Sequence, residues 1–416
     1  MPRQRALNQL ACMSQNLEGS MLSNKKTTNK RKKRGWVDDM LNAENTPSDL
    51  IHQWSPNHKQ LCLNHREKEN DMVPFVLSRR SRRRKKSSTG LSWDHLPDEL
   101  ILRILFCLPL SHLLRTSLVC KRWRRLAFDE SLWYSVDLEG VTNMAAALEL
   151  LLSRGTRRLR CPRTVIQELT FVNMSPAQVV QMDLSHCNVS SESLEVILSC
   201  CSTLTHLSLE SLELSDCILH HLSQNPELIE LNVGGCAGFS PEPLGKMLQS
   251  FSKLEQLNIS WCEFGSDHVK AVVANLPSSL TDLNISGYRE HLAQEDLELL
   301  VERCPNIITL DLSDSVFLRT TCIPTLEQLM HLKHLSLSRC YQIYASSLGD
   351  IGEKITSLRL LDAFGLVHDG RSFSKLYEMK RVAVNTRAIS MVARPTPVQT
   401  DVHFMWDRRC RLRLHY

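Results

Sequence analysis

The sequence lacks the features that define several common functional classes. It has no run of eighteen apolar residues, so no membrane span is expected, and its N-terminus lacks the apolar core of a secretory signal. It contains no phosphate-binding loop, no nucleophile elbow and no group of residues with metal-ligand spacing. We therefore expect a non-catalytic protein that needs no cofactor and no metal.

Cysteine is plentiful but lacks the spacing of a metal site. The chain has 15 cysteines and no Cys-x-x-Cys pair, which argues against a zinc ribbon or a RING domain. The number is odd and no secretory signal is evident, so disulfides are a poor interpretation. We expect reduced, buried thiols in an intracellular protein.

Positive charge is concentrated in residues 1–90, which hold 19 Lys and Arg against 8 Asp and Glu, a balance of +11. Since the whole chain carries +5, the rest of it sums to −6. The leader is polar, with little periodicity, and is predicted to be disordered. Its two basic clusters are interpreted mainly as nuclear import signals and include Lys30, Arg31, Lys32, Lys33, Arg34, Arg82, Arg83 and Arg84.

Two other interpretations of these clusters are a nucleic-acid contact and a merely solvated charge run. No aromatic residues interleave with the basic ones, as a base-stacking surface would require, and the remainder of the chain is acidic. We therefore expect no nucleic-acid partner and no membrane partner. The expected location is the nucleus and the cytoplasm.

Residues 91–135 have the pattern of three short helices. Pro97 suits the first turn of a helix, and Asp98 and Glu99 suit the positive end of its dipole. Apolar residues then recur at intervals of three and four in each segment. So short a segment makes too little core to stand alone, and its remaining apolar surface must be covered by a partner or by the next domain.

Residues 136–378 contain a repeat with a period of about 25 residues. Each unit has an apolar-x-apolar strand with another apolar residue three positions upstream. The strands begin at Met182, Leu207, Leu231, Leu257, Leu283, Leu310, Leu335 and Leu361. Val136-Asp137-Leu138 and Ile166-Gln167-Glu168-Leu169 are interpreted as degenerate first repeats.

Between the strands the apolar period becomes helical. Leu194, Ile197, Leu198 and Cys201 form one such face, and residues 297–304 form another with the same spacing. One strand and one helix per repeat predict a curved solenoid of the α/β class, with parallel strands on the concave face. Cysteines recur five residues after the strand start, at Cys187, Cys236, Cys262 and Cys340, where a small side chain can satisfy loop backbone groups.

The residue before each of these cysteine positions lies four residues after the strand start. These residues should stack into a column along the repeats. Its members are His186, Ser211, Gly235, Trp261, Gly287, Asp314 and Arg339. Trp261, Asp314 and Arg339 are unusual choices for a position that could be small, and Tyr288 and Arg289 lie beside them. These five residues make a candidate binding patch, because aromatic and Arg side chains dominate interfaces. The alternative is scattered surface residues, with Arg339 paired to Asp314.

Residues 379–416 lose the repeat pattern. Val382-Ala383-Val384 could add a last strand, and Pro395 and Pro397 would break any helix. The segment is interpreted either as a loose tail or as an arm over the inner face.

The order Leu96-Pro97-Asp98-Glu99-Leu100, Pro109-Leu110 and Val119-Cys120-Lys121-Arg122-Trp123 resembles the F-box. This module docks a substrate receptor onto the adaptor of an SCF ubiquitin ligase. The resemblance implies that eight residues face the adaptor or pack beneath that face: Pro97, Leu100, Ile101, Ile104, Leu105, Leu113, Val119 and Trp123.

The repeats resemble the cysteine-rich leucine-rich repeats, and residues 92 to about 390 together resemble the S-phase kinase-associated members of the F-box and leucine-rich-repeat family. That resemblance implies a substrate receptor bound through the adaptor to a cullin–RING core. A small cyclin-kinase accessory protein and a phosphorylated inhibitor of cyclin-dependent kinases would bind near Trp261, Arg289, Asp314 and Arg339. The leader would contact a cyclin–kinase complex, and the tail would lie on the concave face. The rival hypothesis is a leucine-rich-repeat scaffold with no role in ubiquitination.

Overall fold

A computed structural model describes residues 93–140, 145–169, 176–349, 351–366, 381–386 and 412–413. The predicted leader, with both basic clusters, lies outside these residues, and so does most of the predicted tail. The predictions of disorder and of nuclear import therefore stay predictions.

The first described segment is helical, as the sequence predicts. Pro97 is the N-cap of the first α-helix, Pro109 precedes the second, and the Cys120 thiol accepts a hydrogen bond from the Trp123 amide at 3.4 Å at the start of the third. These helices pack around fully buried Ile101 and Leu105. The segment consists of η1 (Trp93–His95), α3 (Asp98–Phe106), α4 (Leu110–Thr116), α5 (Lys121–Ala127) and η2 (Glu130–Leu132).

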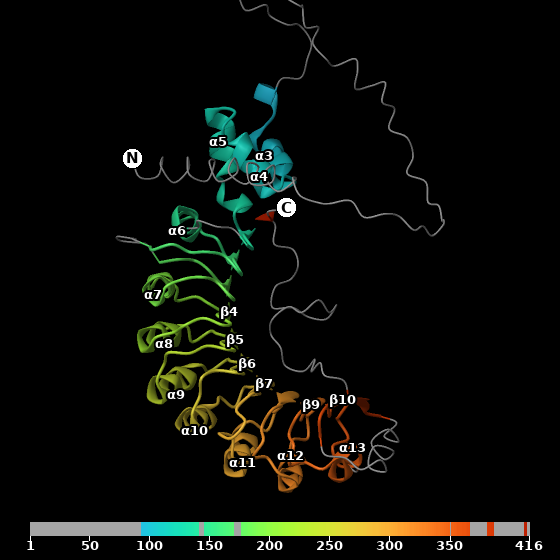
Figure 1. The fold of residues 1–416 in the computed structure, drawn as a ribbon. Helices are drawn as coiled ribbons and strands as arrows, with labels where there is room; N and C mark the ends of the chain where they lie inside the picture. The colour runs from blue at the N-terminus through green and yellow to red at the C-terminus, as the bar shows by residue number, and fades with distance from the viewer. Residues whose placement is uncertain are drawn as a thin grey trace, which may run out of the picture. The chain divides into compact units, whose positions relative to one another are not determined.

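The repeats build one parallel sheet (Figure 1). Its strand order is β11-β10-β9-β8-β7-β6-β5-β4-β3-β2-β1-β12, so neighbours in sequence are neighbours in space except for β12. The strands are β1 (Ser135–Asp137), β2 (Arg158–Arg160), β3 (Gln181–Asp183), β4 (His206–Ser208), β5 (Glu230–Asn232), β6 (Gln256–Asn258), β7 (Asp282–Asn284), β8 (Thr309–Asp311), β9 (His334–Ser336), β10 (Leu360–Asp362), β11 (Ala383–Asn385) and β12 (Leu412–Arg413).

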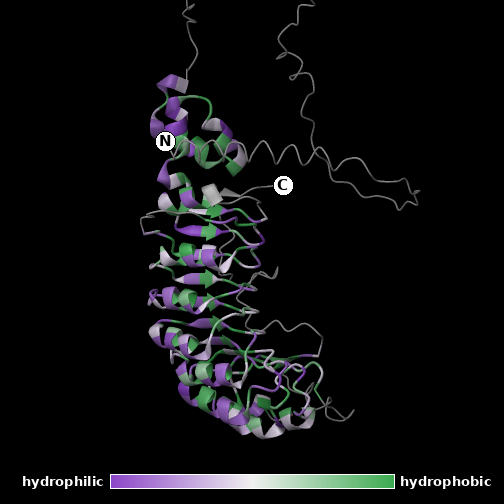
Figure 2. Ribbon diagram, turned by 60° about the vertical axis from the view of Figure 1, so that its left-hand side comes forward, coloured by the Kyte–Doolittle hydropathy of each residue, from purple (hydrophilic) through white to green (hydrophobic). Residues whose placement is uncertain are grey.

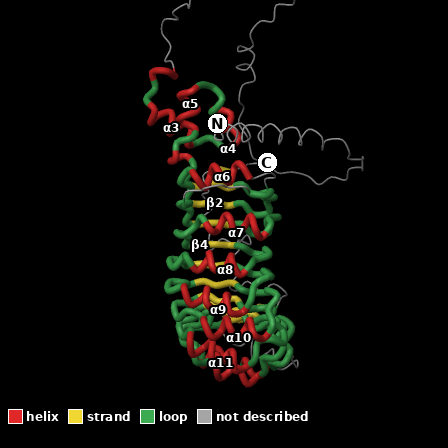
Figure 3. The backbone as a smooth tube through the Cα atoms, turned by 90° about the vertical axis from the view of Figure 1, so that its left-hand side faces the viewer, coloured by secondary structure: helices red, strands yellow, loops and turns green. Residues whose placement is uncertain are grey.

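The helices lie together on one side of this sheet, on the outer side of its curve (Figures 1 and 3). They are α6 (Ala145–Ser153), α7 (Ser191–Ser199), α8 (Asp216–Ser223), α9 (Pro241–Ser250), α10 (Ser266–Asn275), α11 (Gln294–Arg303), η3 (Thr320–Cys322), α12 (Ile323–Leu326), η4 (Ala345–Leu348) and α13 (Ile351–Lys354). The predicted apolar face of Leu194, Ile197 and Leu198 is buried. The predicted solenoid of strands and helices is therefore confirmed.

The core runs between the sheet and the helices. From β1 to β10 the middle strand residue is buried, and so is the residue two positions later, as Leu207 and Leu209 show at 0% exposure. Figure 2 shows hydrophobic and hydrophilic segments recurring along the stacked repeats. Since neither element could bury this surface alone, stacking of neighbouring repeats stabilises the array.

The structure corrects the second degenerate repeat. The strand is β2 at Arg158–Arg160, with Leu159 fully buried, whereas Ile166 lies in the following loop. The apolar residues Ile166 and Leu169 favoured 166–169, but Leu159 between two arginines forms the strand, and Arg160 pairs with carboxylates of the neighbouring strands, Asp137 on β1 and Asp183 on β3.

At the other end of the chain, the suggested last strand is present as β11, so the solenoid extends past residue 378. Residues 412–413 form β12 and pair with β1, Val136 opposite Leu412. The path of residues 387–411 lies outside the described part of the chain, so the arm along the inner face stays a prediction.

Candidate functional site

The eight residues assigned to the first helical segment divide into an outward and an inward set. Ile101, Leu105 and Leu113 are fully buried, and Trp123 is half-buried. Pro97 is exposed, as are Leu100 at 46%, Ile104 at 41% and Val119 at 66%. Leu118, which the sequence reasoning left out, is 61% exposed beside Val119. Exposed leucine, isoleucine and valine side chains on one small helical unit indicate a surface that a partner covers.

An ion-pair cluster holds α3 against α5. The Asp98 carboxylate accepts hydrogen bonds from Arg122, with Nε at 2.8 Å, and from Arg125. The hydrogen bond from Arg122 and the charges of both arginines lower the pKa of Asp98. Because Asp98 begins α3, this cluster fixes the helix that presents Leu100 and Ile104.

In the repeats, a buried polar residue ends most strands and shapes the turn that follows. Asn258 Oδ1 accepts hydrogen bonds from the Ser260 amide at 3.1 Å and from the Ser260 hydroxyl at 2.7 Å. Asp311 accepts from the Ser313 amide at 2.9 Å in the same way. These contacts are Asx turns, in which the side chain replaces a backbone acceptor and directs the chain out of the strand.

The predicted column follows directly on these turns, and all its members have left-handed backbones. Their φ values lie between 55° and 95°. Each amide in turn donates to a carbonyl of the next repeat, as Trp261 does to Ser286 at 2.9 Å and Asp314 to Ser338 at 2.8 Å. The column is therefore a continuous line of turn residues in fixed register. A left-handed conformation costs a non-glycine residue about 1–2 kcal/mol, so Trp261, Asp314 and Arg339 occupy positions where glycine would be less strained.

Trp261 and the charged pair are the prominent side chains of the column. The Trp261 side chain is 47% exposed and lies against the backbone of Gly287 in the next repeat. Arg339 forms a two-point ion pair with Asp314, its Nε 2.6 Å from Oδ1. The hydrogen bond with Asp314 raises the pKa of Arg339. Both the binding patch and the internal pairing named as its alternative are compatible with this geometry, since the Arg339 side chain remains one-third exposed.

Tyr288 requires a correction. It is 2% exposed, and its ring stacks on Phe264 at a centroid distance of 5.1 Å. Burial raises the pKa of its hydroxyl well above the usual value, with a further contribution from the neighbouring Cys262 thiol. Position 288 was assigned to the patch because it lies beside the column, but the left-handed turn at Gly287 directs the following side chain into the core. Tyr288 is therefore a packing residue.

Arg289 is exposed, and its carbonyl accepts hydrogen bonds from the amides of Val316 and Phe317, at 2.8 and 3.3 Å. These bonds bring Phe317, which is 48% exposed, beside Arg289. Tyr341 and Tyr344 are exposed in the next loop. Sequence reasoning missed these three aromatic residues, although each follows closely on a column position.

The four repeat cysteines perform the backbone role that the sequence predicts. Each thiol donates to a carbonyl of the preceding repeat, as Cys262 does to Val233 at 3.1 Å and Cys340 to Leu312 at 3.3 Å. Burial raises the pKa of Cys262 to about 11 and that of Cys340 to about 12. Such thiols are poor nucleophiles at neutral pH, so these two cysteines are unsuited to carry ubiquitin.

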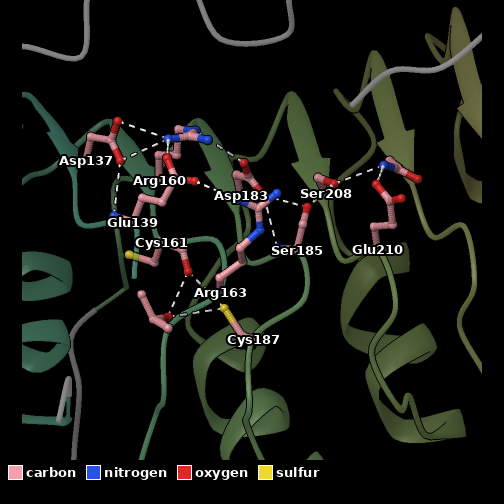
Figure 4. A network of polar contacts seen from close by, with 12 residues as sticks. Asp137, Glu139, Arg160, Cys161, Arg163, Asp183, Ser185, Cys187, Ser208 and Glu210 are labelled. Carbon is pink, nitrogen blue, oxygen red and sulfur yellow. Dashed lines mark hydrogen bonds and ion pairs between the residues drawn. The ribbon is translucent and has the colours of Figure 1, made fainter. Parts of the chain in front are cut away.

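The first repeats hold a separate polar network (Figure 4). The Arg160 guanidinium lies among three carboxylates: Glu139 at 2.7 Å, Asp137 at 3.0 Å and Asp183 at 3.6 Å. Arg160, Asp137 and Asp183 are nearly buried, whereas Arg163, which also reaches Glu139, is exposed. Burial raises the pKa of Asp183, and the charge of Arg160 opposes that effect. Removing Arg160 would leave buried acids without their counter-ion.

A further buried carboxylate lies at the start of β5. Glu230 is 5% exposed and stands in register between His206 on β4 and Gln256 on β6. Burial, together with the charge of Asp282, raises the pKa of Glu230 to about 8. No group of three or more His, Cys, Asp or Glu residues in the described ranges could hold a metal ion. None of the described helices is both long and apolar enough for a bilayer span.

Two family models match the chain. The model of the SKP2 LRR domain matches residues 146–413, and the F-box-like model matches residues 93–139. The first covers more than half of the chain, and the boundary between the two falls where the helical segment meets the first repeats.

Relatives with the same two parts are found in plants and animals. An Arabidopsis thaliana protein described as F-box/LRR-repeat protein 23 is 22% identical over 278 residues, which are 64% of this chain and 53% of that protein. Human F-box/LRR-repeat protein 12 is 33% identical over 147 residues, covering 33% of this chain and 45% of the relative. The chain thus spans about half the length of these two relatives. An internalin from Listeria monocytogenes aligns over 60% of this chain and 72% of its own at 16% identity, with a TM-score of 0.40.

Proposed function

The chain belongs to the family of F-box proteins with a leucine-rich-repeat domain of the SKP2 type, and on this premise we propose that it is the substrate-recognition subunit of an SCF ubiquitin ligase. Its F-box would bind the SCF adaptor, and the adaptor would connect it to the cullin–RING core. Its repeats would bind the protein to be ubiquitinated and so direct that protein to proteasomal degradation.

One observation carries the adaptor proposal. Leu100 and Ile104 project from one face of α3, and Val119 projects from the turn before α5, all three substantially exposed. Burying an aliphatic side chain of this size contributes about 1.5–3 kcal/mol, so three of them could supply much of the binding free energy of a protein partner. The Asp98 ion pairs hold α3 in place without using these side chains.

We further propose that the substrates are phosphorylated cell-cycle regulators of the G1/S transition, such as inhibitors of cyclin-dependent kinases. A small cyclin-kinase accessory protein would bind with them, and the protein would act in the nucleus and the cytoplasm. An exposed tryptophan and a partly exposed arginine side chain support this proposal, and both stand at positions where glycine would be less strained. An arginine suits a carboxylate or a phosphate. Arg289, with Phe317 beside it, extends the same surface.

In this proposal the chain contributes no catalytic group. It would increase the rate of ubiquitin transfer by holding the substrate near the enzyme that the cullin–RING core recruits, which converts a bimolecular encounter into a local one. Ubiquitination would then depend on the two binding surfaces and on the rigid array of repeats between them.

The adaptor proposal is tested by co-purification. The chain and a Leu100→Asp/Val119→Asp variant are each expressed with the adaptor and the cullin. The charged side chains should abolish capture, because the partner would have to desolvate two carboxylates. Met330→Asp, at another exposed apolar position, is the matched control and should leave capture unchanged.

Capture by the double variant equal to that of the wild type would reject the α3 face as the adaptor surface. Failure of the wild-type chain to capture either protein would reject the SCF assignment and favour a repeat scaffold outside ubiquitination.

The substrate proposal is tested with a kinase-inhibitor fragment and the accessory protein. The wild-type chain should retain the phosphorylated fragment in the presence of the accessory protein and release the unphosphorylated one. Trp261→Ala should weaken retention by about tenfold or more, as expected for an interface tryptophan. Equal retention of both fragments would reject phosphorylation-dependent recognition.

A further inference from the structure

A side chain of the column packs on the column residue of the following repeat. In three places that following residue is glycine. Ser211 faces Gly235, Trp261 faces Gly287, and Arg339 faces Gly365. Gly365 was not among the seven predicted members but occupies the same turn position, with a φ of 71°. The residues proposed to bind ligand thus lie on glycines of the following repeat.

The contact between Trp261 and Gly287 leaves no room for a side chain at position 287. A Cβ atom on Gly287 would lie 2.6 Å from Trp261 Cδ2 and 2.9 Å from both Cγ and Cε3. Carbon atoms in contact are normally about 3.5–4.0 Å apart, so the indole would have to move by roughly 1 Å. The Trp261 backbone cannot follow easily, because its amide is bound to the Ser286 carbonyl at 2.9 Å.

Arg339 lies on Gly365 in a similar but less crowded way. A Cβ atom there would be 3.2 Å from Arg339 Cγ and 3.6 Å from its Cα. The Arg339 amide is held by the Phe364 carbonyl, and its guanidinium turns back toward Asp314 in the preceding repeat. The aliphatic stem therefore rests on the glycine while the charged end forms the ion pair.

The positive φ angle alone does not require glycine at these steps. Seven non-glycine residues have positive φ values in the described part of the chain, and five of them are members of the predicted column. Position 287 has a larger φ, 95°, and is further distinguished by the approach of the indole. A Cβ on Gly287 would meet it at 2.6 Å, whereas a Cβ on Gly235 would lie 3.2 Å from Ser211 Oγ.

We propose that Gly287 and Gly365 are positioning residues for protein recognition by the repeats. Gly287 leaves the space that the Trp261 indole occupies against the backbone of the next repeat, and Gly365 does the same for the Arg339 stem. Together they fix the spacing between an aromatic surface and a guanidinium for an incoming protein segment. Such preorganisation raises affinity because the ligand need not order these side chains. This inference rests on the proposed function in taking Trp261 and Arg339 as ligand contacts.

The test compares Gly287→Ala with Gly235→Ala. Both substitutions place a Cβ at a left-handed turn of the same column, but only the first one displaces the indole. The ligand-free measurement is the rate at which N-bromosuccinimide oxidises Trp261, followed by peptide mass spectrometry in the full chain bound to the adaptor. Gly287→Ala should change the rate at Trp261 by about threefold or more, and Gly235→Ala should leave it unchanged.

The binding measurement is a double-mutant cycle on retention of the phosphorylated inhibitor fragment with the accessory protein. Gly287→Ala should weaken retention by about tenfold in the wild type and have no effect in the Trp261→Ala background, because the glycine acts only through the indole. Gly365→Ala should weaken retention of the fragment by about threefold. Gly235→Ala is its control, because Gly235 has nearly the same φ and its added Cβ would also approach a neighbouring side chain to 3.2 Å.

An unchanged oxidation rate in Gly287→Ala would overturn the inference, as would an equal loss of retention with and without Trp261. If the wild-type chain retains no fragment, the proposed substrate is wrong. The oxidation rate still decides whether Gly287 positions Trp261, so the two failures are distinguishable.

Discussion

The column of left-handed turn residues carries different side chains in the first repeats and in the later repeats. In the first repeats, Arg163 and His186 occupy left-handed turns near the carboxylates of Glu139 and Glu210, and Arg160 is enclosed by three acids. In the later repeats, the exposed Trp261 side chain packs on Gly287, and Arg339 forms an ion pair with one acid, Asp314. The left-handed turn is the same at both ends, so the side chains make the difference: the first repeats carry charged and polar contacts, whereas the later repeats carry an exposed indole beside one ion pair.

This difference suggests that the first repeats contribute to stability and the later repeats to binding. The Arg160 guanidinium is balanced by the buried carboxylates of Asp137 and Asp183, so it has little left to offer a ligand, and it holds adjacent strands together. An exposed indole and a partly exposed guanidinium contribute little to folding but present surface to a partner. Substitutions of Arg160 and of Trp261 should therefore have opposite consequences for stability and for binding.

The largest expected effect is on stability, at the first repeats. Arg160→Met keeps the aliphatic stem but leaves Asp137 and Asp183 buried without a counter-ion, and breaking a buried pair in this way costs about 3–5 kcal/mol. Urea unfolding of the full chain measures it. Arg163→Met, which alters an exposed partner of Glu139, should cost less than about 1 kcal/mol. Equal costs would show that the enclosed network is no more stabilising than a surface pair.

At the later repeats we expect a loss of binding without a loss of stability. Trp261→Gly should reduce retention of the inhibitor fragment by about tenfold or more while leaving stability unchanged or higher by about 0.5 kcal/mol, since glycine suits a φ of 58°. Thermal unfolding and retention are measured on the same preparation. A destabilisation of about 3 kcal/mol or more, the usual cost of truncating a core aromatic residue, would mean that the indole is part of the core rather than a binding surface.

Stability should depend on pH through Glu230, which lies on β5, between the first repeats and the later ones. Its folded pKa of about 8 lies above the unfolded value, so the folded state binds the extra proton, and stability falls as pH rises from about 4.5 to 8. Glu230→Gln removes this loss. Its melting temperature should exceed that of the wild type by about 3 °C or more at pH 8 and match it at pH 5.

Glu263→Gln, at an exposed position, is the control for this measurement. A Glu230→Gln curve parallel to that of the wild type from pH 5 to pH 8 would exclude Glu230 as the source of the dependence.

The smallest effect is expected from His186→Gly. It relieves the same left-handed strain as Trp261→Gly, at a φ of 55°, and loses only a distant contact with Glu210 at 3.7 Å. Stability should change by less than about 1 kcal/mol, and retention of the inhibitor fragment should not change. Loss of retention would extend the binding surface to the first repeats and remove the contrast between the two ends.

The sequence by itself determined the repeated units and the helical module before them. A regular repeat period with buried apolar positions can be satisfied only by stacking, so strands, outer helices and the turn column all follow from local pattern. The cysteine positions follow as well, because each thiol satisfies a carbonyl one repeat away. The outward set of Leu100, Ile104 and Val119 could be named but not separated from the buried set, since α3 is short and apolar around much of its surface.

Only the tertiary structure decided features that depend on neighbours distant in sequence. The pairing of β12 with β1 joins the last described residues to the first strand of the array, which no local pattern encodes. Tyr288 is buried because Phe264, one repeat earlier, receives its ring. The choice of Arg158–Arg160 as a strand depends on the carboxylates that surround Arg160, and the role of Gly287 depends on an indole in the preceding repeat. In each case the deciding energy comes from a contact across repeats, whereas local periodicity records only which side of the chain is apolar.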